Sequence, residues 1–219
     1  NPFTGGNASL LRLKLDKHLA KTVLASRGIR VPRGVLITKP DDALPEDIQY
    51  PLMIKPNSEG SSKGITKDSV VENHTDARRH IESILGQYPA GIIAEEFIAG
   101  KELSVPFLET FPGKVLAIVE HTFDLSRLAS RYNIYDYEMK QGGASADAVQ
   151  VVCPADITAQ EEAAVLDMAQ RVFKIMSCPH KGRVDNRLHE NGQPFFIELN
   201  PLHSLPRGAS LMTAARVQA

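Results

Sequence analysis

The 219-residue sequence predicts an α+β protein built from two lobes. Short apolar runs typical of strands come in consecutive groups, and the helical segments lie between these groups. A doubly wound parallel sheet would need strands and helices in regular alternation, so the observed order favours two α+β lobes. An Asn-Gly pair between two apolar runs near the C-terminus adds an antiparallel hairpin. The length allows one large domain or two small lobes, with a substantial core in either case.

The first lobe, residues 1–100, is expected to begin with a helix and continue with strands. Leucine and valine at helical spacing predict a helix over residues 10–27, which ends at Gly28. Thr75 is placed to cap a second helix that runs to Gly86. Short apolar runs predict strands at 35–37, 52–55 and 92–97.

The second lobe, residues 101–219, is expected to hold the longest helix and the hairpin. Thr158 and Glu161 fit a capping box that opens an amphipathic helix to about Met176. A proline-containing loop and a helix of small residues follow the hairpin. Two further strands are predicted at 102–108 and 114–120.

The hairpin turn predicts the register of the two strands that flank it. With Asn191 and Gly192 as a two-residue turn, Glu190 pairs with Gln193. Side chains alternate between the two faces of a strand, so the register also sorts residues by face. The residues expected on the face toward a core are Val184, Leu188, Phe195, Ile197 and Leu199.

The opposite face of the hairpin collects two acids, an amide and an arginine. The register sets Asp185 opposite Glu198. It also sets Arg183 opposite Asn200. Like charges directly across a strand pair destabilise it, so an Asp facing a Glu calls for a counter-ion. Hard oxygen ligands with one amide suit Mg²⁺ bound together with substrate phosphates. The alternative is a surface sheet in which Arg183 and Asp185 form a salt bridge.

Composition is that of an ordinary globular protein and gives no sign of a polyanionic or membrane partner. The 25 basic and 26 acidic residues leave a net charge of -1, so neither nucleic acid nor a membrane is expected. Cys153 and Cys178 lie far apart without metal-ligand spacing, which favours free thiols and a cytoplasmic location. No apolar run approaches the roughly 20 residues that span a bilayer, and no signal peptide is recognisable. The chain begins at Asn1 without an initiator Met, which is typical of a processed or truncated protein.

Two segments of the first lobe could contact a nucleotide. Lys55 stands at a strand end before a loop of small residues, 56–64, whose backbone N–H groups could surround phosphate oxygens. Residues 95–102 form a strand that turns and resumes, which would offer an apolar wall and an acid to a purine and ribose. Taken alone, the first segment is more typical of a flexible surface loop, and the second of an ordinary strand connection.

These segments, the hairpin and the run Tyr135–Lys140 occur here in an order that resembles the ATP-grasp carboxylate-amine ligases, and most of all the D-alanine-D-alanine ligase group. The resemblance covers nearly the whole chain, beginning with Pro2–Gly5 and with Asp16 and Lys17. It implies an ATP-grasp fold, with ATP held between the antiparallel sheets of two α+β lobes. It also implies an enzyme that phosphorylates a substrate carboxylate to an acyl phosphate, which an amine then attacks to form a peptide or amide bond. ADP and phosphate are released.

The resemblance assigns roles to residues at the nucleotide end. The lysines that contact phosphate are Lys17, Lys55 and Lys140. The loop that covers the phosphates carries Ser61, which also counts as catalytic, and Ser62. The residues that meet adenine are Glu95, Phe97 and Ile98, and the one that meets the ribose is Glu102.

The resemblance also assigns the metal and substrate residues. The ligands of Mg²⁺, expected as two ions and replaceable by Mn²⁺, are Asp185, Glu198 and Asn200, and Asn200 also belongs to the nucleotide site. Arg183 is the catalytic arginine that stabilises the transferring phosphate. The substrate residues are Tyr135, Ser210 and Leu211, although Tyr135 could equally be a packing residue.

The loop after Asn200 departs from the family pattern. A glycine aimed at the reacting oxyanion is replaced by Ser204 or Leu205, and Ser210 arrives one position late. His203 and Arg207 could recognise an acceptor carboxylate or could be solvated loop residues. The small-molecule substrates therefore stay open between D-alanine and an L-amino acid or specialised metabolite. A non-catalytic ATP-binding module is the alternative of another class, and homodimers are common in the resembled group.

Overall fold

The computed structural model describes residues 4–111, 113–128, 131–143, 146–202, 205–206 and 208–217. Two antiparallel sheets organise these residues, which confirms the predicted α+β class. The smaller sheet has the order β1 (Gly34–Ile37), β4 (Ile92–Glu96), β2 (Leu52–Pro56) and β3 (Val70–Val71). The larger sheet has the order β7 (Val149–Val152), β6 (Val119–Phe123), β5 (Lys101–Leu108), β8 (Lys181–Leu188) and β9 (Pro194–Asn200).

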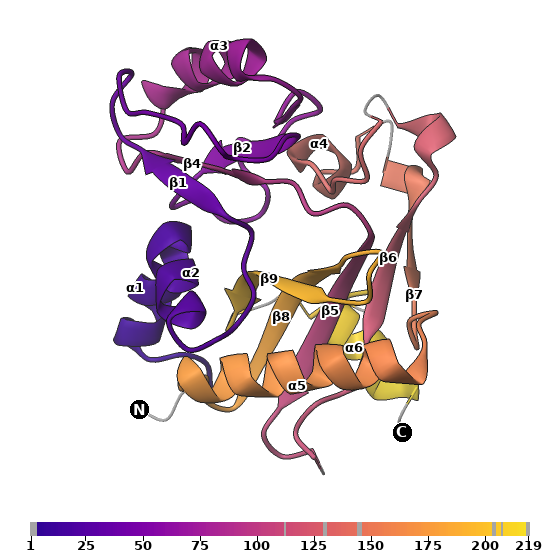
Figure 1. The fold of residues 1–219 in the computed structure, drawn as a ribbon. Coiled ribbons are helices and arrows are strands. Elements are labelled where there is room, and N and C mark those ends of the chain that lie inside the picture. Colours follow the sequence, from indigo (N-terminus) through magenta and orange to yellow (C-terminus); the bar gives the residue numbers. More distant parts are fainter. Residues whose placement is uncertain are drawn as a thin grey trace.

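The helices lie on the outer faces of the two sheets and at their sides (Figure 1). Helix α3 covers the smaller sheet, and the long helix α5 runs across the larger one. The α-helices are α1 (Ala8–Leu15), α2 (Lys17–Ala25), α3 (His74–Leu85), α4 (Tyr137–Lys140), α5 (Ala159–Ile175) and α6 (Ser210–Val217). Two 3₁₀ turns span Leu125–Arg127 and Ala146–Ala148.

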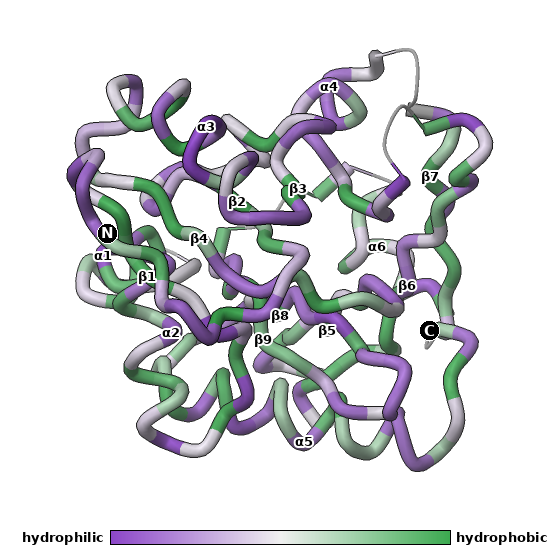
Figure 2. The backbone as a smooth tube through the Cα atoms, turned by 45° about the horizontal axis from the view of Figure 1, so that its top comes forward, coloured by the Kyte–Doolittle hydropathy of each residue, from purple (hydrophilic) through white to green (hydrophobic). Residues whose placement is uncertain are grey.

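Each sheet has its own hydrophobic core. Under the smaller sheet, Ile54 and Ile92 pack with Ile81 of α3. Under the larger sheet, Val184 packs with Phe173 of α5. In Figure 2 the tube is hydrophobic along β1 and the first part of β4, and many of the connecting loops are hydrophilic.

The N-terminal helices belong to the larger core. Leu10 of α1 and Leu24 of α2 are buried against residues of β5, α5 and β9. The chain then leaves this core to build the smaller sheet and returns at β5, so the first helices and the larger sheet are tied together. The boundary expected at residue 100 stays a prediction.

The predicted first helix is wrong in one respect, because it is two helices. Asp16 has extended backbone angles (φ −82°, ψ 95°), and its carboxylate accepts from the Leu19 N–H at 2.9 Å, which caps α2. The side chain of Asn57 also donates to Asp16, at 3.0 Å, and its carbonyl accepts from the Lys17 N–H at 3.2 Å. The break therefore anchors the start of α2 to the loop after β2.

The predicted starts of α5, α3 and β6 can also be compared with the structure. The capping box at Thr158 is confirmed, with Glu161 closing it. Asn73, rather than Thr75, caps α3. The strand predicted over 114–120 is wrong in extent, because β6 begins only at Val119, and the preceding segment makes a single bridge to β5.

The hairpin reaches the predicted pairing by another route. The loop has three residues rather than two, because His189 pairs with Gln193, and Gly192 adopts φ 77° to close it. A bulge then leaves Ile197 without an opposite residue and restores the expected register at Asp185. The pairs Asp185 with Glu198 and Arg183 with Asn200 are confirmed.

The bulge changes which apolar side chains of β9 face the core. The prediction for Phe195 and Ile197 is wrong, because both are only half-buried, and Phe196 fills the core instead. Ile197 and Glu198, consecutive in the chain, both face the space between the two sheets. The bulge thus places an apolar and an acidic side chain side by side.

Two further expectations concern the whole molecule. Both cysteines are free thiols, as predicted, with Cys178 buried and Cys153 half-buried. Among the helices of the described residues, none combines the length and the apolar character needed to cross a membrane.

Candidate active site

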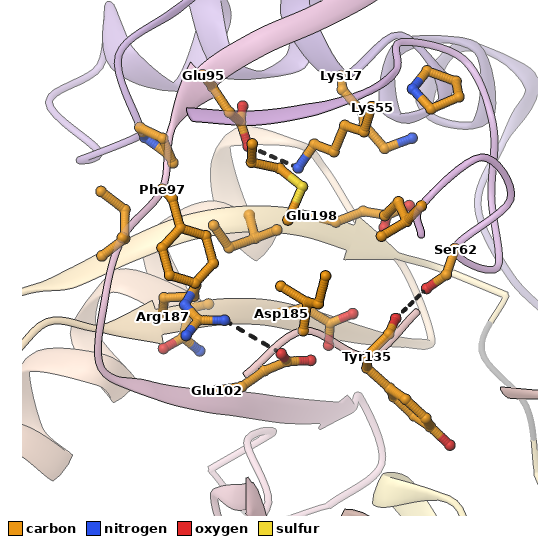
Figure 3. A pocket seen from close by; sticks show the side chains of 18 of the residues that line it. Lys17, Lys55, Ser62, Glu95, Phe97, Glu102, Tyr135, Asp185, Arg187 and Glu198 are labelled. Atoms are coloured by element: carbon orange, nitrogen blue, oxygen red, sulfur yellow. Dashed lines mark hydrogen bonds and ion pairs between the residues drawn. The ribbon is translucent and has the colours of Figure 1, made fainter. Parts of the chain in front are cut away.

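A cavity lies between the two sheets and is lined by residues of both (Figure 3). It encloses about 920 Å³ of empty space, counting the part that is open to solvent. The predicted site residues that line it are Lys17, Lys55, Ser62, Glu95, Phe97, Ile98, Glu102, Tyr135, Lys140, Asp185 and Glu198. Residues spread over the sequence therefore meet in one place.

Lys21, Lys55 and Glu95 form a buried cluster, the lysine cluster, of which Lys55 and Glu95 lie in the upper wall of the cavity in Figure 3. Lys21 of α2 donates to Glu95 Oε2, and Lys55 Nζ lies 2.7 Å from Glu95 Oε1. The three side chains are 2–6% exposed. Burial by itself would raise the pKa of Glu95, but the two ammonium groups lower it to about 2. Glu95 is therefore ionised, and its carboxylate is held between the two lysines beside the cavity.

Lys17 adds a further ammonium group to the same side of the cavity. Its Nζ donates to the carbonyl oxygen of Glu59 and lies 3.5 Å from that of Asn57, in the loop after β2. Burial lowers the pKa of Lys17, and the charge of Glu198 across the cavity partly opposes this effect. The loop thus orients a cation without neutralising it.

The loop of small residues after β2, called here the glycine-rich loop, spans residues 56–65 and is held at two points by the chain around the start of α4. Ser62 Oγ donates to the Tyr135 carbonyl at 2.8 Å, and the Tyr137 N–H donates to the Ile65 carbonyl at 3.2 Å. Ser61 and Ser62 both adopt positive φ, at 55° and 58°, a conformation that costs energy for residues other than glycine. These contacts hold the loop and the segment before α4 together at this end of the cavity.

The opposite wall carries the arginine cluster, formed by Arg183, Asp185 and Asn200. Arg183 holds both oxygens of Asp185, with Nε at 2.6 Å and Nη2 at 2.7 Å. Asn200 Nδ2 donates to Asp185 at 2.8 Å, and Ser104 Oγ of β5 donates to it at the same distance. Asp185 therefore accepts four charge-assisted or neutral hydrogen bonds from three residues.

The charges of the arginine cluster are fixed by this contact. Burial would raise the pKa of Asp185, but the adjacent guanidinium lowers it. Burial would lower the pKa of Arg183, but Asp185 raises it. The two side chains are each 21% exposed, so the pair borders the cavity instead of lying beneath it.

The donor set of this wall fits a divalent cation of the magnesium type. Asp185 and Glu198 face each other on neighbouring strands, and Asn200 lies beside Asp185. One or two carboxylates with an amide leave room for phosphate oxygens, which is how Mg²⁺ is usually bound. Within the described residues, no group of three or more His, Cys, Asp or Glu side chains forms a metal cage. A cation here would therefore depend on a phosphate ligand and would share Asp185 with Arg183.

The far end of the cavity has the character of a nucleoside pocket. Phe97 and Ile98 of the connection between the sheets line it with Ile134, and Glu102 lies at its edge. Burial and the nearby charge of Glu102 raise the pKa of Tyr135. Apolar walls with one carboxylate suit a flat base joined to a sugar with hydroxyl groups.

A family model described as D-ala D-ala ligase C-terminus matches residues 27–214. The chain belongs to this family. It is 30% identical to the D-alanine–D-alanine ligase of Bordetella petrii over 91% of this chain and 58% of that protein. It is also 30% identical to the D-alanine–D-alanine ligase of an Azoarcus species over 99% of this chain and 66% of that protein. The chain thus spans about three fifths to two thirds of the length of the relatives it matches.

Solved structures of D-alanine–D-alanine ligases share the fold. The enzyme from Bacillus anthracis in complex with ATP superposes with a TM-score of 0.76 at 20% identity, covering 99% of this chain and 65% of that one. The VanG D-Ala:D-Ser ligase from Enterococcus faecalis superposes with a TM-score of 0.74 at 23% identity, covering 98% and 61%. The predicted ATP-grasp fold of this family member is thereby confirmed.

Five predicted site residues do not line the cavity themselves. Arg183 and Asn200 reach it through Asp185, and Ser61 is exposed beside Ser62. Ser210 and Leu211 are buried at the start of α6, where Leu211 packs with Leu116 and Val119. The acceptor-loop residues His203, Ser204 and Arg207 lie outside the described residues.

Three residues of the site are absent from the predicted set. Lys21 lies four positions after Lys17, a spacing that places both on one helical face. Arg187 is two residues beyond Asp185 on β8, so strand alternation places it on the face of the cavity. Ser104 pairs with Asp185 across β5 and β8, and only the sheet order reveals that contact.

Proposed function

We propose that this chain is the ATP-grasp part of an ATP-dependent ligase that joins a carboxylate and an amine, in the manner of D-alanine–D-alanine ligases. One observation carries the proposal. The arginine cluster and three cavity-lining lysines face each other across a single cavity, which is the charge pattern that a triphosphate and its metal would require. The B. anthracis relative solved with ATP supports a nucleotide as the occupant.

The residues divide the triphosphate and the nucleoside between them. Lys17, Lys55 and Lys140 face the phosphates, and the loop with Ser61 and Ser62 covers them. The base would lie against Phe97 and Ile98 beside Glu95, and the ribose hydroxyls against Glu102. We place two Mg²⁺ ions at Asp185, Glu198 and Asn200, which would neutralise phosphate charge and align the reactants.

The reaction needs positioning and charge neutralisation more than covalent help from the protein. A substrate carboxylate oxygen attacks the γ-phosphorus of ATP, and the bond to the β-phosphate oxygen breaks to release ADP. The amine then attacks the carbonyl carbon of the acyl phosphate, loses a proton and expels phosphate. Arg183 donates N–H groups where negative charge spreads during both steps, and its bidentate hold on Asp185 fixes its direction.

The substrates are proposed at the level of class. The family match favours D-alanine as donor and acceptor. We keep Tyr135, Ser210 and Leu211 as the proposed substrate residues, of which Tyr135 lines the cavity. The loop after Asn200 departs from the family pattern, which keeps an L-amino acid or a specialised amine as the second candidate. We further propose a cytoplasmic protein that can form a homodimer.

Mg²⁺-dependent release of phosphate from ATP tests the proposal, measured on the native-length protein with a panel of D- and L-amino acids and small amines. We expect release with one donor and acceptor pair. Glu198→Gln should abolish it, and the control Glu190→Gln, in the exposed turn of the same hairpin, should leave it within twofold. Release with D-alanine alone would assign dipeptide synthesis, and release with another pair would assign a new acceptor.

A second variant separates an enzyme from a binding module. Arg183→Met should retain ATP binding and lose turnover, since the arginine acts on charge that develops during the reaction. If no substrate pair gives turnover in the wild type while ATP still binds, the ligase proposal fails and the non-catalytic module takes its place.

A further inference from the structure

Arg187 is a buried cation at the nucleoside end of the cavity, where the other side chains are mostly apolar. Its side chain is 8% exposed, and it lines the cavity together with Phe97 and Ile134. On β8 it pairs with Glu102 of β5 and with Phe195 of β9. Arg187 therefore lies near the end of β8, between β5 and β9, and below Phe97 of the connection between the two sheets (Figure 3).

The guanidinium contacts every segment that forms the nucleoside end. Nη2 donates to the Gly100 carbonyl at 3.0 Å, and Nη1 lies 3.5 Å from Glu102 Oε2. The side chain and the carbonyl of Asn133 accept from it at 2.6 and 3.0 Å. The ring of Phe97 lies 4.7 Å from the guanidinium carbon, within the range of a cation–π contact.

These contacts tie the connection between the sheets to the larger sheet. A Cβ at Gly100 would lie 2.0 Å from the Leu188 carbonyl oxygen, so the connection rests directly on the end of β8. Asn133 also donates to the Gly100 carbonyl, at 2.8 Å. The guanidinium of Arg187 thereby holds Phe97, the turn at Gly100 and the carboxylate of Glu102 in place relative to each other.

The environment of Arg187 is costly for a residue with only a packing role. Its one carboxylate partner is at the long distance of 3.5 Å, and burial lowers the pKa of Arg187, opposed only in part by Glu102. Its Nε lies buried without a hydrogen-bond partner among the described residues. Buried ions of this kind can often be replaced by apolar side chains without loss of stability, so the cation points to a function at the cavity.

We propose that Arg187 is the positioning residue of the nucleoside end: it holds Glu102 toward the ribose hydroxyls and Phe97 against the base. The inference rests on the proposed function, because it assumes that a nucleotide occupies the cavity. It assigns recognition of the nucleoside to Arg187 and leaves the phosphates to the lysines and the arginine cluster at the other end. Binding of the nucleoside and binding of the phosphates should therefore respond separately to substitution.

Equilibrium binding of ATP, 2′-deoxy-ATP, 3′-deoxy-ATP and inorganic tripolyphosphate tests the inference, in the presence of Mg²⁺. The variants are Arg187→Met and Arg187→Lys, which keeps the charge and loses the planar fork. Arg79→Met serves as the matched control, since Arg79 is an exposed arginine of α3. For the wild type we expect ATP to bind about tenfold more tightly than at least one deoxy analogue, the scale of a hydrogen bond to a charged group.

In Arg187→Met the affinity for ATP should fall about tenfold, toward that of the deoxy analogue, whereas tripolyphosphate should bind as in the wild type. Arg187→Lys should lie between the two, and Arg79→Met should match the wild type. In turnover, KM for ATP should rise while kcat stays within about twofold, as expected for lost uniform binding. If Arg187→Met does not fold, Arg187→Lys and the deoxy analogues carry the test.

The inference is overturned if Arg187→Met retains the wild-type ratio between ATP and the deoxy analogues, or if tripolyphosphate binding weakens to the same degree as ATP binding. Both results would leave the proposed function in place. A wild-type protein that binds neither ATP nor tripolyphosphate would instead overturn the proposed function, and this inference with it.

Discussion

The lysine cluster and the arginine cluster face each other across the cavity and differ in how completely they are buried. In the lysine cluster each side chain is at most 6% exposed, whereas Arg183 and Asp185 are each 21% exposed. The first cluster holds the carboxylate of Glu95 between the amino groups of Lys21 and Lys55. In the arginine cluster, the guanidinium of Arg183 and the side-chain amide of Asn200 donate to the carboxylate of Asp185, and Glu198 lies opposite on the neighbouring strand. One wall therefore keeps its ion pairs away from solvent, whereas the other presents groups that a ligand can still reach.

Exchanging Asp185 for Asn should have the largest effect, because it removes a proposed metal ligand and the only carboxylate that contacts Arg183 in the described residues. Turnover should fall by about 10²–10³ or more, the scale of a lost electrostatic contact in a transition state. Stability should fall by about 2 kcal/mol, since the pair is partly exposed. Phosphate release and urea unfolding measure the two effects.

Asp147→Asn is the control for this prediction, because Asp147 is 89% exposed and its arginine partner lies 4.0 Å away. It should change neither quantity appreciably. An Asp185→Asn protein with wild-type turnover would remove the arginine cluster from the reaction.

Among these variants, Glu95→Gln should lower the free energy of unfolding most. It leaves Lys21 and Lys55 buried without their carboxylate, and breaking a buried ion pair typically costs about 3–5 kcal/mol. The urea midpoint should fall accordingly, while the exposed control Glu82→Gln on α3 should stay within about 0.5 kcal/mol. Equal midpoints for Glu95→Gln and the wild type would show that the lysines keep their places without it.

The pH dependence of stability should reflect the same carboxylate. The pKa of Glu95 is lowered from 4.5 to about 2, so its contribution is present above pH 4.5 and is lost as the pH falls toward 2. The loss is on the order of 3 kcal/mol. Burial lowers the pKa of Lys21 from 10.5 to about 7, so between these values the unfolded chain binds more protons and stability should rise with pH.

Urea midpoints measured from pH 2 to pH 10 check both slopes. In Glu95→Gln the acid limb should be shallower than in the wild type. If the loss of stability at low pH is the same in Glu95→Gln as in the wild type, other carboxylates cause it, such as Asp185, whose pKa is also lowered.

Ser62→Ala should have the smallest effect, because the glycine-rich loop belongs to neither cluster. It removes one hydrogen bond to the Tyr135 carbonyl, so stability should change by less than about 1 kcal/mol. KM for ATP should rise more than kcat falls if the loop only covers the phosphates. Ser58→Ala, in the same loop, is the control, and equal effects of the two variants would count against the contact with Tyr135.

The local parts of this architecture could be predicted from the sequence because short-range rules determine them. Apolar runs and the hairpin turn placed six of the nine strands in the described part of the chain close to their observed positions, and the capping box at Thr158 indicated the start of α5. The pairing of Asp185 with Glu198 followed from strand alternation and the turn. It was reached with a two-residue turn, whereas the protein uses a three-residue loop and a bulge at Ile197 whose offsets cancel.

Arg183, Asp185 and Arg187 can be assigned to one face of a strand from the sequence, because side chains alternate with a period of two residues. The partners of those side chains depend on the packing of the whole molecule. Asn57 donates a hydrogen bond to Asp16, where the first helix ends and α2 begins. Glu95 forms ion pairs with a lysine of α2 and a lysine of β2. The guanidinium of Arg187 donates to the carbonyl of Gly100 in the connection between the sheets. Such contacts join residues distant in the chain, and their geometry depends on how the two sheets and helices pack, which no local pattern specifies.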